Sequence, residues 1–93
     1  MQIHLENNGK KGAFFIEENG ERLAAMEFTM AGEHKMIIDH TEVDDRLRGQ
    51  GAGRQLLDQL VAYVRENHIK VIPLCPFAKS RFQKDASIRD VLV

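Results

Sequence analysis

Apolar and polar positions alternate along the first half of the chain. Segment 12–18 is rich in aromatic and other apolar residues, and segment 22–30 returns after Asn19-Gly20. Asn-Gly between two such runs is a strong hairpin signal because both residues tolerate a positive φ. A third run lies at Lys35–Val43, and a short alternating segment at 1–6 precedes the hairpin. The pattern predicts an antiparallel meander of β-strands.

The spacing of the apolar residues changes in the second half. Leucine and valine recur every three or four positions over about 51–67, which is the period of one face of an α-helix. A short apolar run at 69–74 predicts one more strand, and a proline opens a short helix that we expect over 76–84. No pattern assigns an element to the tail at 85–93.

This order of elements predicts a mixed sheet. A helix between two strands of one sheet makes a right-handed crossover, so the strands at 35–43 and 69–74 should run parallel. Pro73 has no N–H for the sheet ladder, which indicates an edge or a break in the pairing. The chain has 93 residues, 43% of them hydrophobic, which is enough to form one hydrophobic core but not two. We therefore expect a single α/β (α+β mixed-sheet) domain over 1–93.

A glycine-rich loop joins the third long strand to the long helix. Gly49, Gly51 and Gly53 alternate there between Arg48 and Arg54. Because glycine has no Cβ, backbone N–H groups can converge on an anion, and the partial positive charge of a helix N-terminus favours phosphate. The loop therefore indicates an anion site, with a merely flexible turn as the alternative interpretation.

Two common phosphate loops do not fit this segment. The NTPase loop has lysine after its last glycine, whereas Arg54 follows Gly53 here. The dinucleotide fingerprint has a third glycine where this chain has Leu56, and it follows its strand through a tighter turn. The segment Arg48-x-x-Gly51-x-Gly53 instead resembles the Gln/Arg-x-x-Gly-x-Gly/Ala signature of the GCN5-related N-acetyltransferases (GNAT).

The resemblance carries expectations for almost the whole chain. In that superfamily the loop lies between strand four and the next helix, its N–H groups hold the pyrophosphate of acetyl-CoA, and pantetheine runs back along strand four. Segments 39–43 and 74–79 are similar to paired signatures of a small stand-alone branch, the YjdJ-type or minimal acetyltransferases. The resemblance implies a minimal GNAT-like fold with acetyl-CoA as co-substrate. It assigns coenzyme binding to Val43, Arg48, Gly49, Gln50, Gly51, Ala52, Gly53, Arg54 and Lys79.

Two side chains are candidates for catalysis. Cys75 directly precedes Pro76, so its thiol should lie at a helix N-terminus, which favours the nucleophilic thiolate. His40 falls near where a thioester lies in the superfamily, and imidazole accepts protons near neutral pH. Position alone leaves a buried cysteine and a hydrogen-bonded histidine open. The resemblance to the minimal branch implies a catalytic pair, and Glu42 shares a strand face with His40 as a second candidate base.

Charge and composition narrow the expected partners. The formal net charge of −1 argues against a nucleic-acid binder that works by general electrostatic attraction. No apolar run approaches the roughly 20 residues of a membrane span, and segment 1–6 has no signal-peptide pattern. A single cysteine forms no internal disulfide, and the histidines and cysteine lack metal-ligand spacing. We expect a cytoplasmic protein without nucleic-acid, membrane or metal partners.

The sequence thus predicts an acetyl-CoA-dependent N-acetyltransferase whose acceptor amine, on a protein or a small molecule, is unknown. The acetyl group would pass through a thioester on Cys75 with His40 as base, or go directly to the amine with His40 or Glu42 accepting the proton. The alternative is a module that binds or senses acyl-CoA without turnover. One feature supports this alternative. Larger superfamily members carry one or two helices between their first two strands, which help to form the acceptor site, whereas this chain has only residues 7–11 there.

Overall fold

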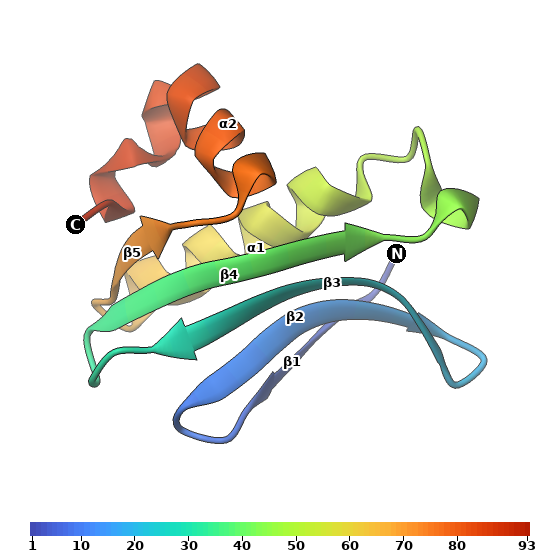
Figure 1. The fold of residues 1–93 in the computed structure, drawn as a ribbon, viewed down its shortest axis with the longest axis horizontal. Helices are drawn as coiled ribbons and strands as arrows, with labels where there is room; N and C mark the ends of the chain where they lie inside the picture. The colour runs from blue at the N-terminus through green and yellow to red at the C-terminus, as the bar shows by residue number, and fades with distance from the viewer.

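A computed structural model describes residues 1–93, with a five-stranded sheet in the order β1-β2-β3-β4-β5 (Figure 1). The elements are β1 (Ile3–Asn7), β2 (Lys11–Glu18), β3 (Glu21–Met30), β4 (Lys35–Val43), the 3₁₀ helix η1 (Asp45–Leu47), α1 (Ala52–Glu66), β5 (Lys70–Pro73), α2 (Pro76–Lys84) and the 3₁₀ helix η2 (Ala86–Val91). None of the helices is long and apolar enough to cross a bilayer.

The sheet is mixed, as the order of elements predicts. Strands β1 to β4 pair antiparallel with their neighbours, and β4 pairs parallel with β5. Asn19 and Gly20 form the β2–β3 turn with φ values of 53° and 78°, so both use the left-handed region that made Asn-Gly a hairpin signal. The predicted meander and crossover are therefore confirmed.

One face of the sheet packs against α1 and the other carries no helix. The apolar stripe of α1 is buried at Leu56, Leu60 and Val64, and it packs on alternate residues of the sheet such as Met26 and Ile38. Figure 1 looks onto the opposite face, with α1 behind the sheet and α2 beside β5. We call this uncovered side the bare face.

The tail, for which the sequence offered no pattern, completes the core. Residues Ile88 and Val91 of η2 are buried, and Val93 N–H donates to Val71 O at 3.1 Å along the outer edge of β5. Arg65 of α1 holds the tail through Asp90 at 2.7 Å. Only two buried apolar positions in a nine-residue segment give no periodicity to detect, which explains why sequence analysis missed this element.

Candidate functional site

The pairing between β4 and β5 stops well before β4 ends. The last paired residues are Ile38 and Pro73, although β4 continues to Val43. Beyond that pair, Ile38 O accepts hydrogen bonds from Leu74 N at 3.0 Å and from Cys75 N at 3.2 Å, and the chain then turns away into α2. The rest of β4 has no strand partner on this side. Pro73 thus lies on an edge strand next to a break in the pairing, as its missing N–H predicts.

A β-bulge in β4 decides which side chains face the bare side. Glu27 pairs with His40 and Phe28 pairs with Ile38, which leaves Asp39 as the extra residue. Thr29 Oγ1 donates to Asp39 Oδ2 at 2.6 Å and so ties the bulge to β3. A bulge re-aims the side chains that follow it. Here it directs His40 to the bare face, opposite Glu27.

The glycine loop presents unsatisfied donors at the start of α1. Gly49 and Gly51 have φ values of 80° and 71°, and a Cβ added to either would have no atom within 4 Å, so both need a left-handed backbone on an open side. Gly51 precedes α1 without a side-chain cap, and no acidic residue stands in the first turn. Of the loop N–H groups, five have no acceptor: those of Gly49, Gly51, Ala52, Gly53 and Arg54. Converging free N–H groups at a helix N-terminus fit a phosphate.

The first turn of α2 lies against the first turn of α1. A Cβ added to Gly53 would come within 2.8 Å of Phe77 Cζ, so glycine is needed there for close approach rather than for an unusual φ. Cys75 precedes α2 without a side-chain cap, and its first turn also lacks an acidic residue. Two helix N-termini, each with a partial positive charge, therefore lie side by side at the site.

The arginines around the loop have different roles. Arg48 is exposed and contacts only Asp45, at 2.8 Å. Arg46, which sequence analysis did not single out, binds both Asp44 at 2.9 Å and Glu21 at 2.7 Å. Hydrogen bonds from the Arg46 side chain and backbone lower the pKa of Asp44 to about 2. Arg46 thus ties η1 to β3, whereas Arg48 pairs only with the equally exposed Asp45.

The other residues expected to bind the coenzyme do not all lie at the glycine loop. Gln50 uses its N–H to bond Leu47 O at 3.2 Å, and Ala52 is buried. Lys79 lies two residues after Phe77, which turns its side chain about 200° around the helix from the contact with α1. It lines a separate hollow near Arg89. The structure therefore does not bring Lys79 together with the glycine loop.

Cys75 and His40 have different partners. The Cys75 side chain is buried, and its Sγ lies 3.4 Å from Thr41 Oγ1, within hydrogen-bond reach. His40 Nε2 lies 3.4 Å from Glu42 Oε1, which agrees with the predicted shared face of these two residues. Thr41 and His40 are successive residues, so their side chains project to opposite sides of β4. Sequence analysis missed Thr41, although its position between His40 and Glu42 already placed it on the inner side.

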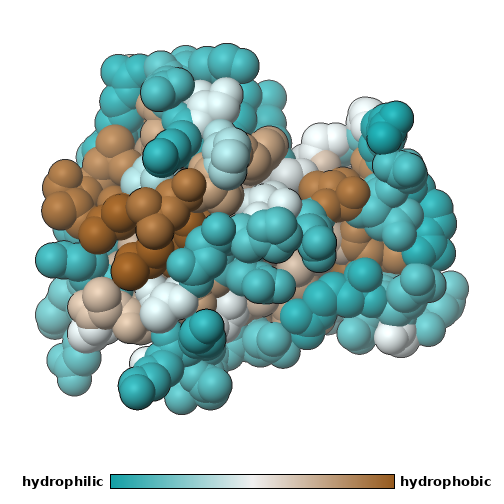
Figure 2. All heavy atoms as spheres, in the orientation of Figure 1, coloured by the Kyte–Doolittle hydropathy of each residue, from teal (hydrophilic) through white to brown (hydrophobic).

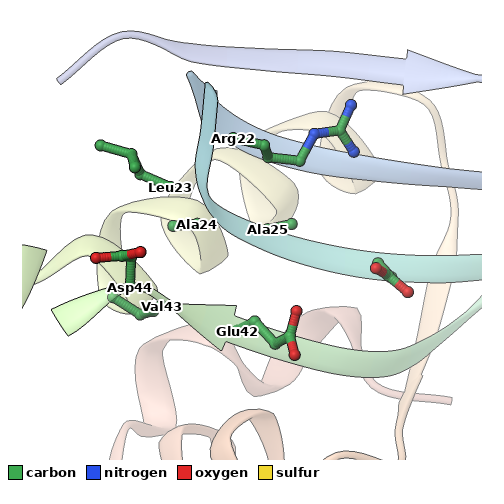
Figure 3. Close-up of a pocket in the computed structure, with 8 residues that line it drawn as sticks. Arg22, Leu23, Ala24, Ala25, Glu42, Val43 and Asp44 are labelled. Atoms are coloured by element: carbon green, nitrogen blue, oxygen red, sulfur yellow. The ribbon is translucent and has the colours of Figure 1, made fainter. Parts of the chain in front are cut away.

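A hollow of about 490 Å³ is lined by residues of the paired strands β3 and β4 (Figure 3). It is lined by Arg22, Leu23, Ala24, Ala25, Glu27, Glu42, Val43 and Asp44. Two of its acids, Glu27 and Glu42, are the cross-strand and same-face neighbours of His40. Sequence analysis did not identify Glu27. Its signal was present as the single charge inside the apolar stretch 23–28.

Comparisons with known proteins match this architecture. A family model described as GCN5-related N-acetyl-transferase matches residues 13–91. A GCN5-like candidate N-acetyltransferase from Staphylococcus aureus, solved by NMR, shares 36% identity and a TM-score of 0.71, over 97% of this chain and 87% of that chain. Protein NATD1 of Xenopus tropicalis is 28% identical over 74 residues, which cover 78% of this chain and 68% of that protein.

The likeness extends to larger proteins at the level of the fold alone. The crystal structure of Tetrahymena GCN5 has a TM-score of 0.66 at 15% identity and covers 83% of this chain, but only 51% of that chain is matched. The family model spans most of the present chain, including the uncapped loop and the divergence of β4 from β5. The chain therefore belongs to the GCN5-related N-acetyltransferase family.

Proposed function

We propose that this protein transfers an acetyl group from acetyl-CoA to an amine. The observation that carries the proposal is the uncapped loop 49–54, whose free N–H groups stand beside the unpaired part of β4. These N–H groups would hold the coenzyme pyrophosphate, with Arg48 and Arg54 supplying charge. The free backbone edge of β4, as far as Val43, would pair with the pantetheine arm. Lys79 has no role in this proposal because it lies on another side of α2.

Cys75, which is the N-cap residue of α2 and faces Thr41 on the inner side of β4, supplies the nucleophile of the proposal. The Cys75 sulfur would attack the acetyl carbonyl carbon, and the bond from that carbon to the coenzyme sulfur would break as the bond to Sγ forms. The thiol proton would leave with the coenzyme sulfur, giving free CoA and a thioester on Cys75. Thr41, at 3.4 Å, can donate its hydroxyl proton to the sulfur while negative charge resides there.

The bare side of β4 supplies the base. The acceptor amine would attack the thioester carbonyl from the side of His40, and the carbon–Sγ bond would break. The proton released by the amine would pass to His40, whose Nε2 lies 3.4 Å from the Glu42 carboxylate. Direct attack of the amine on acetyl-CoA would use the same base without Cys75. The two routes differ only in whether Cys75 is acetylated.

Calorimetry with acetyl-CoA and mass spectrometry of the same sample test this proposal. Gly51→Glu should abolish binding, because it places a carboxylate among the free N–H groups. Gly32→Glu is a matched control, since Gly32 also has a positive φ, of 87°, and an open side but lies in the β3–β4 turn. If the unaltered protein shows no binding at millimolar coenzyme, the proposed function is wrong.

The uncovered sheet favours one second candidate, an acyl-CoA-binding module without turnover. No element of this chain encloses an acceptor on the bare face (Figure 1). A protein that binds acetyl-CoA but yields neither acetyl-Cys75 nor any acetylated amine would be such a module. A mass increase of one acetyl group on Cys75, absent from Cys75→Ala, would favour the enzyme with the covalent route. Acetylated amine at an unchanged rate in Cys75→Ala would favour direct transfer.

A further inference from the structure

The hollow lined by β3 and β4 has a neighbour on the bare face. A second hollow of about 240 Å³ reaches the β1–β2 end of the sheet, and both hollows are lined by Arg22 and Glu27. We call the two together the acidic track. The surface over β2, β3 and β4 is mostly hydrophilic, while hydrophobic residues gather beside β5 (Figure 2). The track is thus a long, polar and shallow depression rather than an enclosed pocket.

Carboxylates outnumber cations along the track. Its acids are Glu6, Glu27, Asp39, Glu42 and Asp44, and its bases are Lys11 and Arg22. Several of these groups already have partners within the protein. Arg22 forms an ion pair with Glu6 at 3.0 Å, and Asp44 forms one with Arg46. Glu27 forms no direct ion pair, although its charge adds to the hydrogen bond with Glu6 in raising the pKa of the nearby Arg22, and Glu42 has only the imidazole of His40. With five carboxylates against two cations, the track carries negative charge that its own bases only partly neutralise.

Glu27 and Glu42 flank the proposed base. Glu27 is the direct cross-strand partner of His40, a position in which Cβ atoms lie about 5 Å apart. Glu42 lies beside His40 on the same strand face. A positively charged acceptor drawn to these carboxylates would bring its amine to His40. The remaining length of the track would contact the flanking parts of the acceptor.

We propose that the acidic track binds the acceptor as a basic peptide segment of another protein, with a lysine placed at His40 and further positive charges along the track. This inference rests on the proposed acetyl transfer. A small amine would leave most of its surface exposed in so shallow a depression, whereas binding sites for small ligands usually enclose them. An extended segment can fill both hollows at once, and its cations complement Glu27 and Glu42.

Peptide titration followed by NMR amide shifts tests the inference without requiring turnover. The probe is a short peptide with one lysine flanked by arginines, and its matched control has glutamines in place of the arginines. We expect shifts at Ala25, Glu27 and His40 with the basic peptide, weaker binding of the control peptide, and affinity that falls as salt rises. Spermidine should bind more weakly than the basic peptide. Spermidine binding as tightly as that peptide would overturn the choice of a peptide acceptor.

Charge-neutralising variants locate the interaction. Glu27→Gln and Glu42→Gln should each weaken binding of the basic peptide about two- to fivefold, as exposed ion pairs do, and the double variant should weaken it about tenfold. Glu66→Gln, an exposed glutamate on α1, is the matched control and should have no effect. Equal binding of both peptides, or unchanged affinity in the double variant, would overturn the inference. Because acetyl-CoA binding is measured separately, its loss alone would instead overturn the proposed function.

Discussion

At the scale of single residues, the glycines of the loop serve two physical needs. Gly51 occupies a left-handed backbone with φ of 71°, whereas Gly53 is needed because Phe77 leaves no room for a Cβ. A sequence motif shows the same letter at both positions. The structure shows different constraints at the two positions. Substitution by alanine should therefore destabilise the fold for a different reason at each.

Gly53→Ala should destabilise the fold by about 1 kcal/mol. The methyl group would overpack against Phe77, a cost of about 1–3 kcal/mol that alanine's better helix propensity of about 1 kcal/mol partly offsets. The double variant Gly53→Ala with Phe77→Leu should recover this loss, as measured by urea unfolding. Gly51→Ala should cost about 1–2 kcal/mol through backbone strain, and Phe77→Leu should not recover it. Equal rescue at both positions would contradict this distinction.

The contact between Thr41 and Cys75 gives a kinetic prediction. Thr41→Val keeps the shape of the side chain but removes the hydroxyl 3.4 Å from Sγ. If that hydroxyl stabilises charge on the sulfur, acetylation of Cys75 by acetyl-CoA should slow about tenfold, the effect of losing one hydrogen bond to a charged group. Time-resolved intact-mass measurement gives the rate. Thr41→Ser restores a hydroxyl and should retain the rate, while an unchanged rate in Thr41→Val would assign Thr41 a packing role only.

At the scale of elements, the link between η1 and β3 should make the stability of the segment before the glycine loop depend on pH. Hydrogen bonds from Arg46 lower the pKa of Asp44 to about 2 from an ordinary value of 3.8. A lowered pKa means that Asp44 stabilises the fold fully above about pH 3.8 and that this stabilisation is lost as the pH falls through 2. Asp44 also accepts from Arg46 N–H as the cap of η1.

Asp44→Asn should therefore lower the free energy of unfolding at neutral pH. The difference from the unaltered protein should shrink between pH 4 and pH 2 and vanish below it, because both proteins then carry a neutral side chain at this position. Denaturant unfolding at a series of pH values measures the difference. Asp58→Asn on the exposed side of α1 is the control. A difference that stays constant down to the lowest pH would show that Asp44 acts by shape and not by charge.

At the scale of the whole molecule, what could be predicted from sequence was local in origin. The Asn19-Gly20 turn, the stripe of α1 and the break at Pro73 each follow from residues close together in the chain. The crossover rule then assembled them into the correct mixed sheet. The family resemblance from the glycine motif is likewise confirmed.

The parts that sequence did not reveal depend on contacts between distant elements. The extra residue Asp39 is defined only by the register of β4 against β3, and it determines that His40 faces Glu27 rather than Cys75. The partner of Cys75 is Thr41, across a gap that opens only because β5 ends early. These contacts have no periodic signal. The site is therefore a property of the assembled sheet.

The tail gives the last prediction, because its buried residues Ile88 and Val91 belong to the core and not to the proposed site. Ile88→Ala should lower the free energy of unfolding by about 2 kcal/mol, at the low end for a buried isoleucine since this one lies at the rim of the core. The melting temperature should fall by about 10 °C in a single transition, because η2 packs on α1 and α2 as part of one core. Acetyl-CoA affinity at a temperature where the variant is folded should be unchanged, since the glycine loop and the free edge of β4 keep their neighbours. Two separate transitions would show instead that the tail folds onto an already stable sheet and helix pair.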